Sequence, residues 1–145
     1  MSERQSAIVV AAVGALQDGW VGLRVREALG LLVAADARVN QWMVEVGKSQ
    51  FGPDEFLTFG IEYAECCDEV EAAWDRYRAH GFPEALEAAN ALPAAEERTA
   101  RHEQLSPQRH AAQEELLAVL LDVTERMRRL IEGGHAESRS HKKLG

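Results

Sequence analysis

A chain of 145 residues has the length of one ordinary domain and can bury a core without a disulfide or metal staple. Its formal net charge of −8 argues against binding to nucleic acid or to an anionic membrane, since both attract basic surfaces. Only two cysteines occur, the neighbours Cys66 and Cys67, which excludes a disulfide framework and favours a reducing compartment, the cytoplasm.

Residues 3–17 are expected to form a short, mostly buried helix. Its apolar residues cover more than one face, as in a helix packed on several sides: Ile8, Val9, Val10, Val13 and Leu16. The apolar run over residues 7–16 is about half as long as a membrane-spanning helix, and no convincing cleavage site of a signal peptide precedes Gln17. We therefore expect neither a membrane span nor an export signal.

A second helix is predicted over residues 20–47, where seam positions alternate in spacings of three and four: Gly22, Val25, Leu29, Leu32, Asp36, Val39, Met43 and Val46. This spacing is typical of helices that pack at shallow angles. Asp36 is the exception, because a carboxylate buried in such a seam is costly without a partner. Two interpretations stay open: a structural aspartate paired with a neighbour or water, or a functional carboxylate inside the bundle.

The third helix is predicted to start at Gly52, with Pro53 suited to the first helical position, and to end at Gly81 as the residue after the last turn. Phe51 and Phe56 have the spacing of a hydrophobic staple across its start. Its seam is unbroken: Phe56, Phe59, Tyr63, Cys66, Val70, Ala73 and Tyr77. Residues 51–80 contain eight acids and two bases, so this stretch supplies −6 of the net charge of −8.

Residues 82–105 are rich in alanine and are predicted to form two helical pieces broken at Pro93, weakly anchored because they offer few large apolar side chains. The last helix is predicted to begin with Ser106 as N-cap and Pro107 at the first position, and to end at Gly133 and Gly134.

Residues 1–133 are expected to be a single domain and residues 134–145 a disordered polar tail. The expected fold class is all-α, an antiparallel helical bundle of three long helices plus shorter helices.

One cluster of acids suggests a specific chemistry. Glu62, Glu65 and Glu69 follow one another at one-turn spacing and lie within about 60° on the surface of the third helix. Stacked carboxylates repel unless water, a base or a divalent cation relieves them, and oxygen ligands of this kind suit Mg²⁺. These three residues are the candidate metal ligands.

Residues 51–74, FGPDEFLTFGIEYAECCDEVEAAW, resemble the first metal-binding helix of the all-α nucleoside triphosphate pyrophosphohydrolases, the MazG-like group. Glu62 and Glu65 match the E-x-x-E motif of that family. The resemblance implies Mg²⁺-dependent release of pyrophosphate from a nucleoside triphosphate. The second family motif, E-x-x-D, falls on residues 114–118, where Ala118 stands in place of the aspartate.

No complete catalytic set is found, because the chain has no glycine-rich phosphate loop, no CxxC, no HExxH and no GxSxG. We therefore predict a non-enzymatic helical-bundle protein that acts through protein–protein contacts, either by self-association as a homodimer or with a protein partner, and the acidic helix would be the docking face for a basic partner. A Mg²⁺-dependent pyrophosphohydrolase, or a degenerate relative of one, is the alternative. No catalytic residue and no cofactor other than this Mg²⁺ is assigned. Further binding candidates are Asp36, Glu115 and Asp122.

Overall fold

A computed structural model describes the backbone of residues 7–47 and 53–144 and the side chains of residues 7–45 and 57–133. The helices are α1 (Ala7–Gln17), α2 (Leu23–Trp42), the π-helical η1 (Met43–Gly47), α4 (Pro53–Ala79), α5 (Phe82–Asn90) and α6 (Ala95–Leu144). The described backbone contains no strand, so the predicted all-α fold class is confirmed. None of the helices in these ranges is long and apolar enough to cross a membrane.

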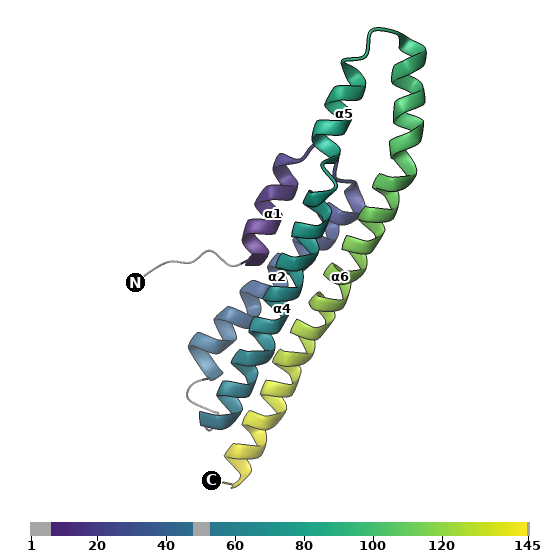
Figure 1. Cartoon of the computed structure of the whole chain (residues 1–145). Helices are drawn as coiled ribbons and strands as arrows, with labels where there is room; N and C mark the ends of the chain where they lie inside the picture. Colours follow the sequence, from purple (N-terminus) through teal and green to yellow (C-terminus); the bar gives the residue numbers. More distant parts are fainter. Residues whose placement is uncertain (1–6, 48–52, 145) are drawn as a thin grey trace.

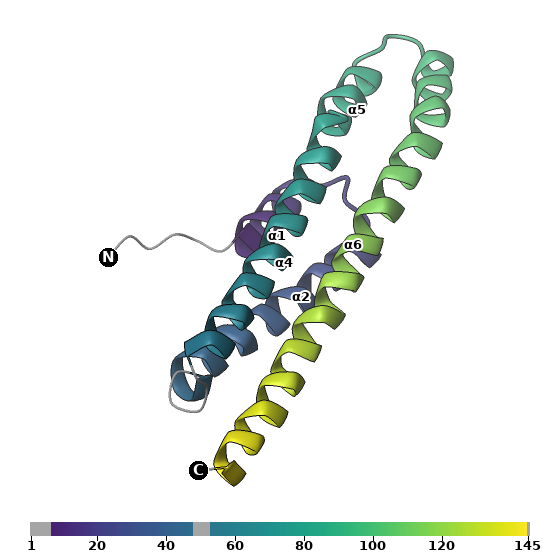
Figure 2. The same ribbon diagram turned by 60° about the horizontal axis from the view of Figure 1, so that its bottom comes forward.

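The helix α6 packs against both α2 and α4, and α1 packs against the same two helices (Figure 1). The short helix α5 follows α4 and packs on the first part of α6. When the molecule is turned, α4 and α6 still run alongside each other, whereas α2 runs obliquely behind them, from α6 toward the lower end of α4 (Figure 2). The fully buried core side chains come from α1, α2, α4, α5 and α6 and include Ile8, Leu32, Val39, Val70, Leu86, Leu120 and Met127.

The predicted seams of the second and third helices form much of this core. Along α2 the seam residues from Val25 to Val39 are buried, and along α4 the buried seam residues are Phe59, Cys66, Val70, Ala73 and Tyr77. Phe59 of the α4 seam meets Trp42 of α2, with 4.8 Å between the ring centroids. Trp42 is buried, whereas its neighbour Met43, the predicted seam residue, is only partly buried. The predicted staple between Phe51 and Phe56 lies outside the described side chains.

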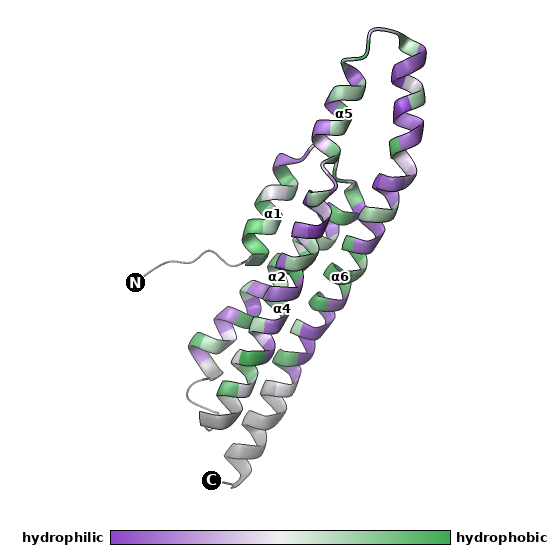
Figure 3. Cartoon of the chain, in the orientation of Figure 1, coloured by the Kyte–Doolittle hydropathy of each residue, from purple (hydrophilic) through white to green (hydrophobic). Residues whose placement is uncertain are grey.

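The helix α1 is less buried than predicted. Its contact face consists of Ile8, Ala11 and Ala15, whereas its outer face exposes Val10 by 47%, Val13 by 45% and Leu16 by 68%. Figure 3 shows α1 as mostly apolar along its length, including this outward side. The expected burial on several sides is wrong because α1 meets its neighbours through a narrow strip of small side chains.

Gly81 ends α4 as predicted. It has φ 65° and ψ 34°, a left-handed conformation that glycine adopts without steric cost. Its N–H donates to the carbonyl of Arg78 at 3.0 Å, and its own carbonyl accepts from the N–H of Ala85 at 3.0 Å. Gly81 therefore accepts the first hydrogen bond of α5 and ends α4.

The predicted break at Pro93 is confirmed, because α5 ends at Asn90 and α6 begins at Ala95. The guanidinium of Arg98 closes this turn by donating to the carbonyls of Leu92 at 2.7 Å and Pro93 at 3.1 Å. The neighbouring helices are packed rather than weakly anchored, since four of their apolar side chains are buried: Phe82, Leu86, Ala89 and Leu105.

The predicted start at Ser106 is wrong, because α6 runs without interruption through Pro107. Proline removes one helical N–H, which leaves the carbonyl of Glu103 without its usual donor. Glu103 and Pro107 are exposed, so water can reach this part of the helix. The buried positions Leu105 and Ala112 continue one seam on either side of the proline, and their packing outweighs the local stop signal.

The predicted end at Gly133 and Gly134 is also wrong. The backbone of α6 stays helical to Leu144, through residues that were expected to form a disordered tail. A glycine stop requires a positive φ, and within the described backbone only Gly81 adopts one. Two glycines cost a helix about 1 kcal/mol each but do not prevent it from continuing.

Candidate functional site

Arg126 on α6 lies between Glu69 on α4, a predicted metal ligand, and Asp122 on α6, a predicted binding residue. The sequence analysis did not single out this arginine. Arg126 donates to the carboxylate of Glu69, and its guanidinium lies 3.6 Å from the carboxylate of Asp122 one turn earlier on α6. The hydrogen bond to Glu69 raises the pKa of Arg126, so this side chain stays charged. A guanidinium therefore occupies the position between these two carboxylates.

Glu62 and Glu65 are exposed on α4, and neither takes part in an ion pair among the described side chains. Within the same residues, no group of three or more His, Cys, Asp and Glu side chains is placed to hold a metal ion. The metal site at Glu62, Glu65 and Glu69 stays a prediction, and a cation there would have to compete with Arg126 for Glu69. In the second acidic motif, Glu114 pairs with Arg24 at 2.7 Å.

Asp36 is 4% exposed and has the partners that its seam position requires. Its Oδ1 accepts from the hydroxyl of Tyr63 at 2.6 Å and from Nδ2 of Asn40 at 3.3 Å. Nδ2 of Asn40 also lies 3.0 Å from the Tyr63 hydroxyl oxygen. Burial, followed by the bond to Asp36, raises the pKa of Tyr63, so its phenol stays protonated as a donor. These contacts favour the structural interpretation of Asp36.

The adjacent cysteines are free thiols, with Cys66 buried and Cys67 partly buried. Burial raises the pKa of Cys66 to about 11 and also raises the pKa of Cys67. Both thiols are therefore protonated near neutral pH, where only the thiolate form is a strong nucleophile. Cys66 therefore packs in the α4 seam, and Cys67 lies partly buried beside it.

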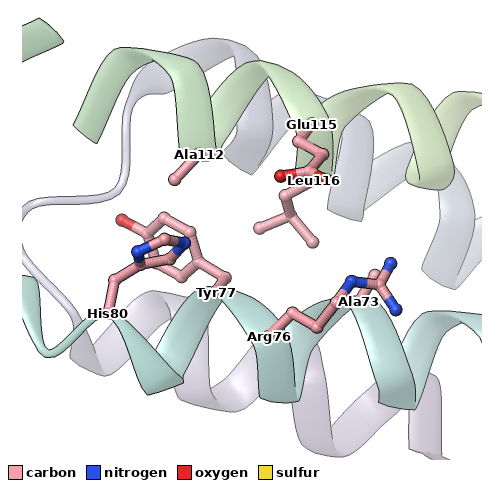
Figure 4. A pocket seen from close by; sticks show the side chains of 7 residues that line it. All are labelled: Ala73, Arg76, Tyr77, His80, Ala112, Glu115 and Leu116. Carbon is pink, nitrogen blue, oxygen red and sulfur yellow. The ribbon is translucent and has the colours of Figure 1, made fainter. Parts of the chain in front are cut away.

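Glu115 lies apart from the other candidates, on the rim of a small cavity between α4 and α6 (Figure 4). The side chains around it are Ala73, Arg76, Tyr77 and His80 from α4 and Ala112, Glu115 and Leu116 from α6. The cavity encloses about 10 Å³, which is room for about one water molecule. It is too small for a nucleotide, and the candidates Asp36, Glu115 and Asp122 therefore occupy three separate places.

Gln113 on α6 is a further polar residue that the sequence did not single out. Its Nε2 donates to the carbonyl of Trp20 at 2.9 Å and to the hydroxyl of Tyr77 at 3.3 Å, and its Oε1 accepts from the N–H of Gly22 at 3.0 Å. One side chain thus ties the turn before α2 to α4 and α6.

We expect Gln113→Ala to lower the free energy of unfolding by about 1–2 kcal/mol, because it leaves backbone groups of the turn without their partner. Chemical denaturation measures the loss, and Gln108→Ala, at an exposed position of the same helix, is the control. An equal effect of the two substitutions would show that the Gln113 contacts do not stabilise the turn.

The outer face of α4 carries a concentration of acids. It is formed by exposed residues outside the seam and includes Leu57, Ile61, Glu62, Ala64, Glu65, Asp68, Glu71, Ala72 and Asp75. Leu57 is 63% exposed and Ile61 is 52% exposed, so an apolar end adjoins the acids. The outer face therefore combines exposed apolar area with negative charge.

Comparisons with known proteins identify no relative: no family model matches the chain, and no curated protein and no solved structure matches it. The resemblance of residues 51–74 to the MazG-like group therefore stays an expectation from the sequence.

Proposed function

We propose that this chain is a non-enzymatic, cytoplasmic protein that works through protein–protein contacts. In this proposal its three long helices form an antiparallel bundle, with the shorter helices packed on it, and present the outer face of α4 to a partner. The partner is a second copy of the chain or a different protein with a basic surface. No cofactor is required.

The observation that carries the proposal is the set of uncompensated acids on α4. Glu62, Glu65, Asp68, Glu71 and Asp75 are all exposed, and none forms an ion pair within the described side chains. By contrast, Glu69 is neutralised by Arg126. Unpaired charges of one sign along a helix attract a surface of the opposite sign and orient it before contact.

The apolar end of the same face supports a protein partner rather than diffuse counter-ions. Leu57 and Ile61 are one turn apart and are both more than half exposed. Large apolar side chains in one patch favour a site of protein contact when polar groups surround them. Contact at this end would add burial to the electrostatic attraction of the rest of the face.

We expect the immobilised wild-type chain to retain a partner protein from cell extract that a charge-reversed variant does not retain. The variant is Glu62→Lys with Glu65→Lys and Asp68→Lys, which reverses three exposed acids of α4. Placing like charges against a basic partner costs several kcal/mol, which is enough to abolish retention. Mass spectrometry identifies the retained protein, and sedimentation equilibrium of the free chain tests for a second copy.

A matched control carries the same change of charge elsewhere: Glu27→Lys on α2 with Glu103→Lys and Glu132→Lys on α6, all at exposed positions. This control should retain the partner as the wild type does, and circular dichroism should show that all three proteins are folded. Identical sets of retained proteins, together with identical sedimentation, would rule out a docking role for α4.

A further inference from the structure

A groove beside the outer face of α4, with which it shares Asp75, has the shape and the charges of a docking site. It is lined by residues of α1, the turn after it, α4 and α5, and it encloses about 850 Å³. The volume equals about two turns of an α-helix about 10 Å in diameter. We call it the α1 groove.

The apolar wall of the α1 groove comes from α1. Val10 and Val13 line it and are 47% and 45% exposed, and the buried indole of Trp74 forms part of its floor. The sequence of α1, AIVVAAVGALQ, contains no charged residue, so its outward side offers only apolar area and one amide. Exposed valines at helical spacing are anchoring points for an apolar stripe of another helix.

A second part of the lining is acidic, and we call it the acidic wall. It consists of Asp75 from α4, Glu84 and Glu87 from α5, and Asp18 from the turn after α1. Arg78 is the single base among the lining residues. The lining therefore contains four acids and one base, which favours a cationic ligand.

We infer that the α1 groove binds an amphipathic helix of a partner protein, with an apolar stripe of about two turns and lysine or arginine residues beside it. The stripe packs on Val10 and Val13, and the flanking cations face Glu84 and Glu87. This inference rests on the proposed function, since it names the kind of partner segment, but it places the contact mainly on α1 and α5, and the groove shares only Asp75 with the outer face of α4.

The test uses a synthetic peptide of about 18 residues, made of leucine and lysine so that a helix carries the leucines on one face. Trp20 and Trp74 line the groove, so we expect binding of the full-length chain to change tryptophan fluorescence. A peptide of equal charge without leucine is the control for general attraction to an acidic protein, and it should bind at least about tenfold more weakly.

Two variants of the groove should weaken binding of the leucine–lysine peptide at least about tenfold. Val13→Asp alters the apolar wall, and Glu84→Gln with Glu87→Lys alters the acidic wall. Glutamine is used at position 84 because Glu84 lies in the first turn of α5, where lysine is unfavourable. The matched controls are Leu121→Asp, at a residue 47% exposed on α6, and Glu103→Lys with Glu132→Gln.

Equal affinity of the wild type and both groove variants would overturn the inference, as would equal affinity for the peptide without leucine. Loss of binding only in the variant Glu62→Lys, Glu65→Lys, Asp68→Lys would also overturn it, while leaving the proposed docking on α4 in place. A dimer of the chain alone that Val13→Asp dissociates would assign the groove to a second copy instead.

Discussion

Replacing Tyr63 by phenylalanine is expected to lower the free energy of unfolding by about 1.5–3 kcal/mol, the usual worth of a hydrogen bond to a charged group. The phenol makes the shortest hydrogen bond to Asp36, at 2.6 Å, and Asp36 is 4% exposed. Without it, the carboxylate keeps only the longer side-chain bond from Asn40, at 3.3 Å. Chemical denaturation at neutral pH measures the change.

A double-mutant cycle separates this bond from the packing around it. We expect Asp36→Leu with Tyr63→Phe to be more stable than Tyr63→Phe alone, because the double variant buries no charge. Asp36→Leu alone should be less stable than the double variant, because it removes the acceptor of the Tyr63 phenol and the Asn40 amide. Strict additivity of the two single changes would mean that the Asp36–Tyr63 bond contributes nothing to stability.

The same pair predicts a dependence on alkaline pH. The folded-state pKa of Tyr63 is raised, mainly by burial and then by Asp36, above the value of about 10 for a free tyrosine. The unfolded chain therefore loses this proton first, and the stability that the protonated phenol contributes falls as pH rises above about 10. The difference in stability between wild type and Tyr63→Phe should shrink over that range; a constant difference would contradict the raised pKa.

The second large effect is expected at the contact of α1 with α4. A Cβ added at Gly14 would lie 2.8 Å from Cζ2 of Trp74, and this indole is buried and cannot easily move. We expect Gly14→Ala to destabilise the fold by about 1–3 kcal/mol through overpacking. A thermal or denaturant unfolding curve followed by tryptophan fluorescence measures the loss and reports any displacement of Trp74.

Gly30→Ala is the matched control, because Gly30 is exposed on α2 and an added Cβ there would meet nothing within 4 Å. Alanine should stabilise that helix by about 0.5–1 kcal/mol, since it loses less backbone freedom on folding. The two glycine-to-alanine changes should therefore have opposite signs. The same sign at both positions would show that α1 does not pack closely on Trp74.

The fold could be predicted wherever a local signal agreed with the apolar spacing. Gly81 after a continuous seam predicted the end of α4, and the seam register placed Asp36 among buried residues. The local signals failed at Ser106–Pro107 and at Gly133, where the helix continued against them. The packing of Leu105 and Ala112 along one seam stabilises a continuous helix by more than the exposed Pro107 destabilises it.

The arrangement of the candidate residues could not be predicted, because it depends on how α4 and α6 are aligned. Arg126 comes 57 positions after Glu69, so no spacing in the sequence links them. The long-range contacts of Gln113 likewise have no local signal. Tyr63 belonged to a predicted seam and Asp36 was expected to need a partner, but no signal in the sequence linked the two residues.

The outward side of α1 was mispredicted for a related reason. Apolar composition alone does not show which residues make the contact, and here the alanines do so while Val10 and Val13 stay exposed. Small side chains permit the closest approach of two helix axes, so the buried strip of α1 is narrow. The exposed side of α1, with Val10 and Val13, forms the apolar wall of the α1 groove.

The most direct test of docking on α4 is the salt dependence of the affinity for the purified partner, measured by isothermal titration calorimetry. The Debye length falls from about 30 Å at about 10 mM salt to about 8 Å at about 150 mM. We expect the Kd of the wild type to rise at least about tenfold over this range, and that of the variant Glu62→Lys, Glu65→Lys, Asp68→Lys to be weak at both concentrations. A wild-type Kd that is the same at low and moderate salt would contradict the proposed role of the acidic face.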